Sequence, residues 1–211
     1  MIKLLPTALC VILTLPWASI VSLGSMKKCD GKVRSFIKST LNFYKMVKKI
    51  LIGLAALFIV IQFIRPAENN SNDETQSIST KYNVPKEVES ILKTACYDCH
   101  SNKTTYPWYA KIQPVLWWLD HHIDEGKREI NFSAFMGRRM AIQNKKFKEI
   151  AEQVETKEMP LPSYTYAGLH ADANLTDAQR QTLIQWAKAQ QDTLKAHYPE
   201  DSLVLKRPQG K

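Results

Sequence analysis

Three residues near the middle of the chain, Cys96, Cys99 and His100, form a Cys-x-x-Cys-His motif. Their side chains can form covalent bonds or bind a metal. Two residues between the cysteines place the sulfur atoms about one helical turn apart, and the adjoining histidine adds an imidazole. Covalent haem attachment needs this set, because two thiols add to the porphyrin vinyl groups and an imidazole binds the iron. The motif therefore predicts one covalent haem c, attached at Cys96 and Cys99, with His100 as proximal axial ligand.

The same residues have two other interpretations. A redox-active dithiol also contains Cys-x-x-Cys, but it occurs in a βαβ context, and no strand alternation surrounds this pair. A structural zinc site normally has four ligands, and the remaining cysteines, Cys10 and Cys29, form no second pair. Zinc would then need two of the histidines at positions 121, 122, 170 and 197. Haem attachment is favoured over both.

A six-coordinate haem iron needs a second axial ligand, for which Met159 is the leading candidate. Pro160 favours an extended conformation at Met159, and Pro162 stiffens the loop that follows. A thioether on such a loop can bind iron, although a methionine can also simply fill a gap in a core. His122 is the alternative distal ligand, and His121 lies about 100° from it around the same helix, so at most one of them faces the haem.

Aromatic residues are frequent in the stretch that follows the motif. A haem requires an apolar wall, and rings that carry one polar atom can also reach its propionates. Each of these residues is equally well an ordinary core residue, and His170, further along, is interpreted as a loop residue. The aromatic residues are Tyr106, Trp108, Tyr109, Trp117 and Trp118.

The net charge of +9 is concentrated at the front of the chain. Residues 1–49 contain nine Lys or Arg and one acidic residue, whereas residues 50–211 contain twenty basic and nineteen acidic residues. Because the body of the chain is nearly neutral, the charge pattern excludes a nucleic-acid partner. A length of 211 residues suits one domain with accessory segments.

Two apolar segments precede the domain. Residues 1–49 form a basic N-terminal extension that contains a possible signal or first apolar segment at 4–23. Residues 50–64 are uncharged and apolar and predict a transmembrane signal-anchor. The stretch that begins at Met46 would form a complete signal-anchor without the residues before it. The basic residues before this run favour a single-pass protein of the inner (cytoplasmic) membrane, with its C-terminal domain facing the periplasm.

The remainder of the chain predicts a flexible linker, an all-α domain and a tail. Residues 65–83 are polar and predict the linker, residues 84–195 the domain, and residues 196–211 a loosely held tail. Helical periodicity places one helix directly before the motif. Further helices are predicted from Pro114 to Glu125, ending at Gly126, from Lys145 to Val154, and after Thr176, which caps reciprocally with Gln179.

The domain resembles class I cytochrome c and, more closely, the family of membrane-anchored bacterial haem-binding domain proteins. The resemblance covers roughly residues 84–188 and rests on the stretches "CYDCHSN", "YPWY", "HHIDEGKREINFS", "EMPLPSY" and "LTDAQRQTLIQWA". It implies a small cytochrome c-like helical domain around one covalent haem, with Cys96 and Cys99 as attachment points and His100 as proximal ligand. Met159 corresponds to the distal ligand of the general cytochrome c pattern.

These features predict a membrane-anchored monohaem c-type cytochrome that transfers single electrons on the periplasmic side. Its expected partners are periplasmic or membrane redox proteins, the membrane itself through the N-terminal helix, and the cytochrome c maturation machinery. The alternative is a haem-based redox or gas sensor, or ligand-binding module, with an open or displaceable sixth iron position. An enzyme such as a haem peroxidase is disfavoured, because a distal acid or base beside an open iron would be needed.

Overall fold

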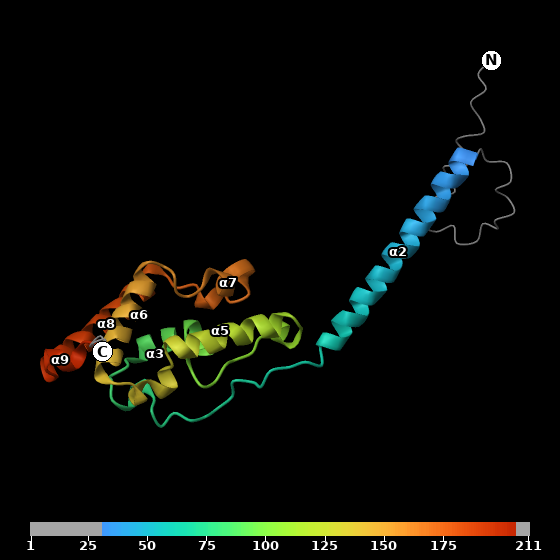
Figure 1. Ribbon diagram of the computed structural model, residues 1–211. Coiled ribbons are helices and arrows are strands. Elements are labelled where there is room, and N and C mark those ends of the chain that lie inside the picture. Colours follow the sequence, from blue (N-terminus) through green and yellow to red (C-terminus); the bar gives the residue numbers. More distant parts are fainter. Residues whose placement is uncertain (1–30, 206–211) are drawn as a thin grey trace, which may run out of the picture. The chain divides into compact units, whose positions relative to one another are not determined.

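The computed structural model describes residues 31–205 and divides the chain between Phe63 and Ile64 into two compact units. The described part of the first unit is the long helix α2 (Gly31–Ile61), and all the other helices of residues 31–205 belong to the second unit (Figure 1). Over these residues no strand forms, and one isolated bridge pairs Asn70 with Lys103. The predicted all-α class is confirmed for this part of the chain. The apolar segment at 4–23 lies outside it.

The apolar run at 50–64, for which the sequence predicts a transmembrane signal-anchor, is only partly helical. Helix α2 ends at Ile61, so the helical part of the run is about 18 Å long, against roughly 30 Å for a bilayer core. The preceding turns of α2 carry Lys45, Lys48 and Lys49. Within residues 31–205, no helix is both long and apolar enough to cross a membrane.

The second unit consists of helices joined by short 3-10 turns. Its longer helices are α3 (Lys86–Ala95), α5 (Val115–Glu129), α6 (Met140–Glu155) and α8 (Asp177–His197). Its short helices are α4 (Tyr97–His100), α7 (Pro162–Thr165) and α9 (Glu200–Leu203). The 3-10 turns are η3 (Ile78–Thr80), η4 (Trp108–Lys111), η5 (Phe132–Gly137), η6 (Tyr166–Gly168) and η7 (Ala171–Ala173).

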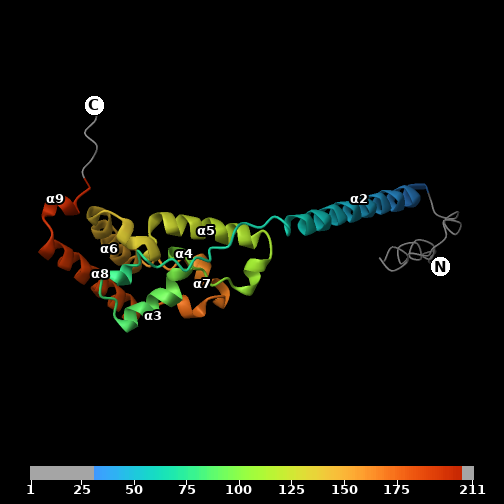
Figure 2. The ribbon, with the colours of Figure 1, turned by 90° about the horizontal axis from the view of Figure 1, so that it is seen from below.

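The larger hydrophobic cluster lies where α6 packs along α8 and where α3 packs against α8 (Figure 2). Phe147 is completely buried there and contacts Tyr82 and Trp186 edge to face, with ring centroids 4.9 and 5.7 Å apart. Burial of an aromatic or aliphatic side chain of this size contributes about 1.5 to 3 kcal/mol. This cluster therefore provides most of the hydrophobic stabilisation of the unit.

A smaller cluster forms around α5, and the motif helix α4 lies between the two. The smaller cluster contains Ala110, Leu116, Leu119 and Ile123. Cys99 packs against this smaller cluster, whereas Cys96 packs against the larger one. The short helix that carries the motif is thus held by two separate sets of apolar contacts.

The segment at 65–83, predicted as a flexible linker, packs against the domain. Ile78 is completely buried in the larger cluster. The side chain of Asn69 donates to Ser101 O and Thr104 Oγ1, and its main-chain N donates to Tyr106 Oη at 2.8 Å. Short polar side chains such as Asn bond readily to nearby main chain, so a polar composition does not by itself imply a free tether. This segment fixes the loop that follows His100.

The predicted helix ends differ from those of the structure. α5 continues past Gly126 to Glu129, and α6 begins at Met140, five positions before Lys145. The helix before the motif is confirmed, and so is the reciprocal cap of α8 between Thr176 and Gln179.

The C-terminal boundary lies further on than the expected one at residue 195. Helix α8 continues to His197, and the short helix α9 follows. Leu203, in α9, is 6% exposed and belongs to the larger cluster. Part of the predicted tail therefore completes the core, because one apolar side chain at its end finds a buried position.

Candidate functional site

The three motif residues span the short helix α4. Helix α3 ends at Ala95, Cys96 caps α4, and Cys99 and His100 lie one turn further along. His100 N donates to Cys96 O at 2.9 Å, which is the helical bond that closes this turn. Both cysteines are free thiols and are half-buried. The spacing predicted from the sequence is therefore realised as one helical turn with two available sulfur atoms.

The imidazole of His100 is oriented by main-chain oxygens. His100 Nδ1 lies 2.9 Å from Gly126 O and 3.0 Å from Ile130 O, both at the C-terminal end of α5. A carbonyl oxygen only accepts hydrogen bonds, so Nδ1 carries the proton and Nε2 carries the free lone pair. Burial lowers the pKa of the His100 imidazole, with the two hydrogen bonds acting in the opposite direction. This is the tautomer that a metal-binding histidine uses, with its other nitrogen fixed by a carbonyl.

Gly126 permits the contact between α4 and α5. A Cβ atom at this position would lie 2.7 Å from Cys99 O and 3.2 Å from Cys99 Cβ, which is closer than van der Waals contact allows. The same residue provides one of the oxygen atoms that accept from His100. The sequence interpretation used Gly126 as a helix end, whereas in the structure it allows the close approach of two helices.

The environment of the thiols differs from that of a redox dithiol. Burial raises the pKa of Cys96 to about 12, and burial together with Asp98 raises the pKa of Cys99 to about 11. Reactive dithiols have lowered thiol pKa values, since the thiolate is the nucleophile. Thiols with raised pKa values on this half-buried helical turn do not match a redox pair.

The zinc interpretation finds no completing ligands among residues 31–205. No group of three or more His, Cys, Asp or Glu side chains in that range lies close enough to hold a metal ion. His121 forms an exposed pair with Glu125, and His197 bonds to Thr193 O in α8. Among the described residues, the cysteine pair therefore lacks the further ligands that a structural zinc site needs.

Met159 begins the loop that joins α6 to α8. We call residues 159–173 the distal loop. Met159 is half-buried and belongs to neither hydrophobic cluster of the described residues, so it does not fill a core gap. Its main-chain N donates to Gln153 O at 3.1 Å, and its O accepts from Arg180 Nη1 at 2.8 Å. The main chain of Met159 is thus fixed by groups other than its thioether.

His122 lies on α5, the helix whose carbonyl oxygens hold His100. Its ring packs against Trp118, with centroids 4.3 Å apart, and its Nδ1 donates to Trp118 O. It is four residues before Gly126 and so lies near the same face of α5. His122 therefore lies on the helix that orients His100, while Met159 comes from a different segment of the chain.

Sequence interpretation missed Asp98, which lies between the two cysteines. Its Oδ2 accepts from Tyr164 Oη at 2.7 Å, and its Oδ1 accepts from Thr105 N at 2.9 Å. Burial and the bond to Asp98 raise the pKa of Tyr164, so the phenol stays protonated and donates. The carboxylate between the two cysteines could have been noticed in the sequence. Its partner Tyr164 could not, because it is 66 residues away along the chain.

His170, interpreted from the sequence as a loop residue, is part of the same set of contacts. Its ring stacks on that of Tyr164, with centroids 4.1 Å apart and an interplanar angle of 12°. A hydrogen bond of 2.6 Å joins its Nε2 to Tyr109 Oη. The structure therefore brings two residues of the distal loop to α4 and to η4.

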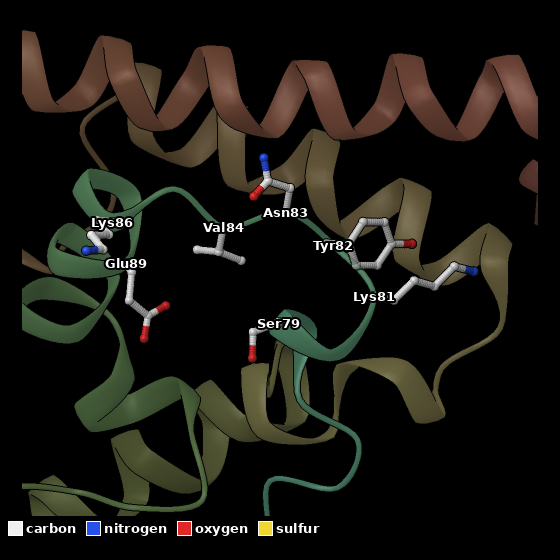
Figure 3. A pocket seen from close by; sticks show the side chains of 7 residues that line it. All are labelled: Ser79, Lys81, Tyr82, Asn83, Val84, Lys86 and Glu89. Carbon is white, nitrogen blue, oxygen red and sulfur yellow. The ribbon is translucent and has the colours of Figure 1, made fainter.

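The pocket shown in Figure 3 lies away from the motif cysteines and His100, between η3 and α3. Glu89 connects it to the motif, because Tyr97 Oη donates to Glu89 Oε2 at 3.0 Å. None of the predicted haem-binding residues lines it. The lining residues are Ser79, Lys81, Tyr82, Asn83, Val84, Lys86 and Glu89.

Comparison with known proteins gives one match. A family model described as a haem-binding domain matches residues 56–189, a range that includes the motif, α5 and the distal loop. No curated protein and no solved structure matches the chain.

Proposed function

Since the chain belongs to the haem-binding domain family, we propose that it is a monohaem c-type cytochrome that transfers single electrons. Cys96 and Cys99 would hold the haem through thioether bonds, and His100 Nε2 and the Met159 thioether would bind its iron. When bound, the haem iron supplies a one-electron redox centre, and Met/His ligation raises its reduction potential. The observation that carries the proposal is the Nδ1–H of His100, bonded to Gly126 O and Ile130 O.

The residues of the site have separate tasks. The two thiols fix the position of the cofactor, and the carbonyl oxygens of α5 set the orientation of the imidazole. The two hydrophobic clusters on either side of α4 limit the access of water to the attachment points. Because both axial positions are filled in this proposal, the protein is an electron carrier for periplasmic or membrane redox proteins rather than an enzyme.

The proposal includes export of the domain. Attachment of c-type haem takes place outside the cytoplasm, and the basic residues that precede the apolar run favour export of the chain that follows. We expect the full chain to acquire covalent haem in cells that contain a cytochrome c maturation system. A chain without residues 1–63 should acquire none, and covalent haem in that variant would contradict the export proposal.

The distal ligand is tested on the full chain with Met159→Leu, which keeps the apolar volume but removes the sulfur. The ferric wild type should show the long-wavelength methionine–iron charge-transfer band, and the variant should lose it while it keeps covalent haem. Met140→Leu is the matched control, because Met140 packs against the larger cluster. No covalent haem in the wild type would refute the cytochrome itself, whereas an unchanged band in Met159→Leu would refute only this ligand.

The second candidate function is a haem-based sensor or ligand-binding module with a displaceable sixth position. It is favoured by the way in which the distal loop is attached, since the bonds of Tyr164 and His170 to other elements are made by side chains. Five-coordinate iron in the wild type, or rapid binding of carbon monoxide to the ferrous form, would support this function over electron transfer.

A further inference from the structure

The start of the distal loop is fixed through its main-chain carbonyl oxygen, which accepts from a side chain of α8. Arg180, in α8, is 8% exposed and donates from Nη1 to Val154 O at 3.1 Å and to Met159 O at 2.8 Å. A buried guanidinium that donates to carbonyl oxygens holds them firmly, because charge-assisted hydrogen bonds are stronger than neutral ones. These bonds position the main chain of Met159 but leave the direction of its side chain free.

A second point of the same loop, at Tyr164, is fixed to the attachment helix. Tyr164 Oη donates to Asp98 Oδ2 at 2.7 Å, and Asp98 lies between the two attachment cysteines. The carboxylate is itself held, since its other oxygen accepts from Thr105 N, and Asp98 O accepts from Thr104 Oγ1 at 2.6 Å. Tyr164 is five residues after Met159, so this bond limits how far the loop between them can move from α4.

A second contact supports the first. The ring of His170 stacks on Tyr164 with an interplanar angle of 12°, and its Nε2 is joined to Tyr109 Oη at 2.6 Å. Gly168 has φ +74°, a left-handed conformation that glycine adopts without strain, and it turns the chain so that His170 returns to Tyr164. The stack therefore holds the Tyr164 ring in the orientation in which its hydroxyl reaches Asp98.

These side chains contribute little to the core. Tyr164, His170 and Tyr109 are half-buried, and none belongs to either hydrophobic cluster of the described residues. Removing one hydroxyl from this set leaves the packing of α3, α6 and α8 unchanged. The contacts are thus suited to setting the position of the loop rather than to stabilising the fold.

We infer that Tyr164 and His170 are positioning residues that keep the distal loop against the attachment helix and thereby keep the Met159 thioether at the iron. Asp98 is their anchor on α4, and Tyr109 is their anchor on η4. This inference rests on the proposed function, in which Met159 is the distal ligand. When the Asp98–Tyr164 bond is absent, Met159 leaves the iron more often and an external ligand enters the sixth position.

The test uses the full-length holoprotein with Tyr164→Phe, which removes only the hydroxyl. Tyr166→Phe is the matched control, because Tyr166 lies in the same loop and is 74% exposed. The readouts are the methionine–iron band of the ferric form and the rate at which the ferrous form binds carbon monoxide. We expect Tyr164→Phe to bind carbon monoxide about tenfold faster, which corresponds to loss of about one hydrogen bond. The control should match the wild type, and covalent haem should be retained in both.

His170→Gln and Asp98→Asn provide further measurements. If Tyr164 acts through Asp98, the double variant should change the binding rate by less than the product of the two single effects. His170→Gln should change the rate in the same direction as Tyr164→Phe, without loss of covalent haem. A merely structural role would lower the melting temperature without this pattern of rates.

Two results would overturn the inference, and only one of them would also overturn Met159 as the distal ligand. A wild type with the methionine–iron band and a Tyr164→Phe variant that binds carbon monoxide at the wild-type rate would refute the positioning role alone. A wild type that lacks the band would refute Met159 as ligand and the positioning role with it, while leaving covalent haem attachment intact.

Discussion

His100 and the loop that carries Met159, the two proposed iron-binding parts of the molecule, are held by different kinds of group. His100 donates to Gly126 O and Ile130 O, which are main-chain atoms at the C-terminal end of α5. The loop that carries Met159 is held largely by side chains. The residues that provide these side-chain bonds are Asp98, Tyr109, Tyr164, His170 and Arg180.

This difference predicts different tolerance to change. A main-chain acceptor is present whichever side chain the residue carries, so the proximal contact depends on helix packing and on the one glycine that allows it. A side-chain contact disappears with a single substitution. The position of His100 is therefore expected to be rigid, and the position of Met159, the proposed distal ligand, to be adjustable by individual residues.

The largest effect should follow Gly126→Ala, which disturbs the packing of α4 against α5 beside His100. The added Cβ would lie 2.7 Å from Cys99 O, and neither backbone yields easily, so α4 and α5 must separate. We expect a loss of about 1 to 3 kcal/mol in the free energy of unfolding. We also expect a weakened His100 bond to the iron. Urea denaturation and the ferrous absorption spectrum measure the two effects.

Gly137→Ala is the control for this substitution, because no atom lies within 4 Å of a Cβ at that position. It should leave both the unfolding free energy and the spectrum close to those of the wild type. Equal stability of the Gly126→Ala and Gly137→Ala variants would show that close helix approach does not build the proximal side.

A smaller effect is expected from Arg180→Gln, which removes the hydrogen bond that holds the start of the distal loop. Met159 O loses its donor, and the loss of one half-buried hydrogen bond costs about 1 kcal/mol. The methionine–iron band should weaken while the ferrous spectrum keeps the features of His100 ligation. Arg128→Gln is the control, since Arg128 is exposed and its contact with Glu125 is 3.9 Å. A band of wild-type strength in Arg180→Gln would separate Arg180 from the distal ligand.

The smallest effect, and one of opposite sign, is expected at Lys157, two residues before the distal loop. Lys157 has φ +60°, a left-handed conformation that is strained for a residue with a side chain. Lys157→Gly should raise the free energy of unfolding by up to about 1 kcal/mol through relief of that strain. Lys157→Ala retains the Cβ and serves as control, and thermal denaturation compares the three proteins. If glycine and alanine had the same effect, the strain at this position would be negligible.

Much of the helical framework followed from patterns of neighbouring residues. The helix before the motif and the reciprocal cap of Thr176 and Gln179 are confirmed, because both depend on contacts within one helical turn. The same holds for the spacing of the motif, which the structure realises as one turn of α4. Helix ends were less predictable, since Gly126 continues α5 where its type suggested an end.

The segment at 65–83 shows why composition can mislead. Its polar residues predicted a free linker, but Asn69 bonds to Ser101 and Thr104, and Ile78 is buried. One buried isoleucine and a few Asn bonds are enough to dock a short segment, and a composition average does not register them.

The sequence by itself determined the chemistry that is local along the chain: two thiols and an imidazole on one turn, because helical geometry converts their spacing into a fixed arrangement. Only the tertiary structure decided which tautomer His100 adopts and which residues hold the loop of Met159. The acceptor Gly126 is 26 residues from His100, and Tyr164 is 66 residues from Asp98. Such pairs meet only when separate helices pack, and the position of one helix against another depends on the whole core rather than on any local pattern.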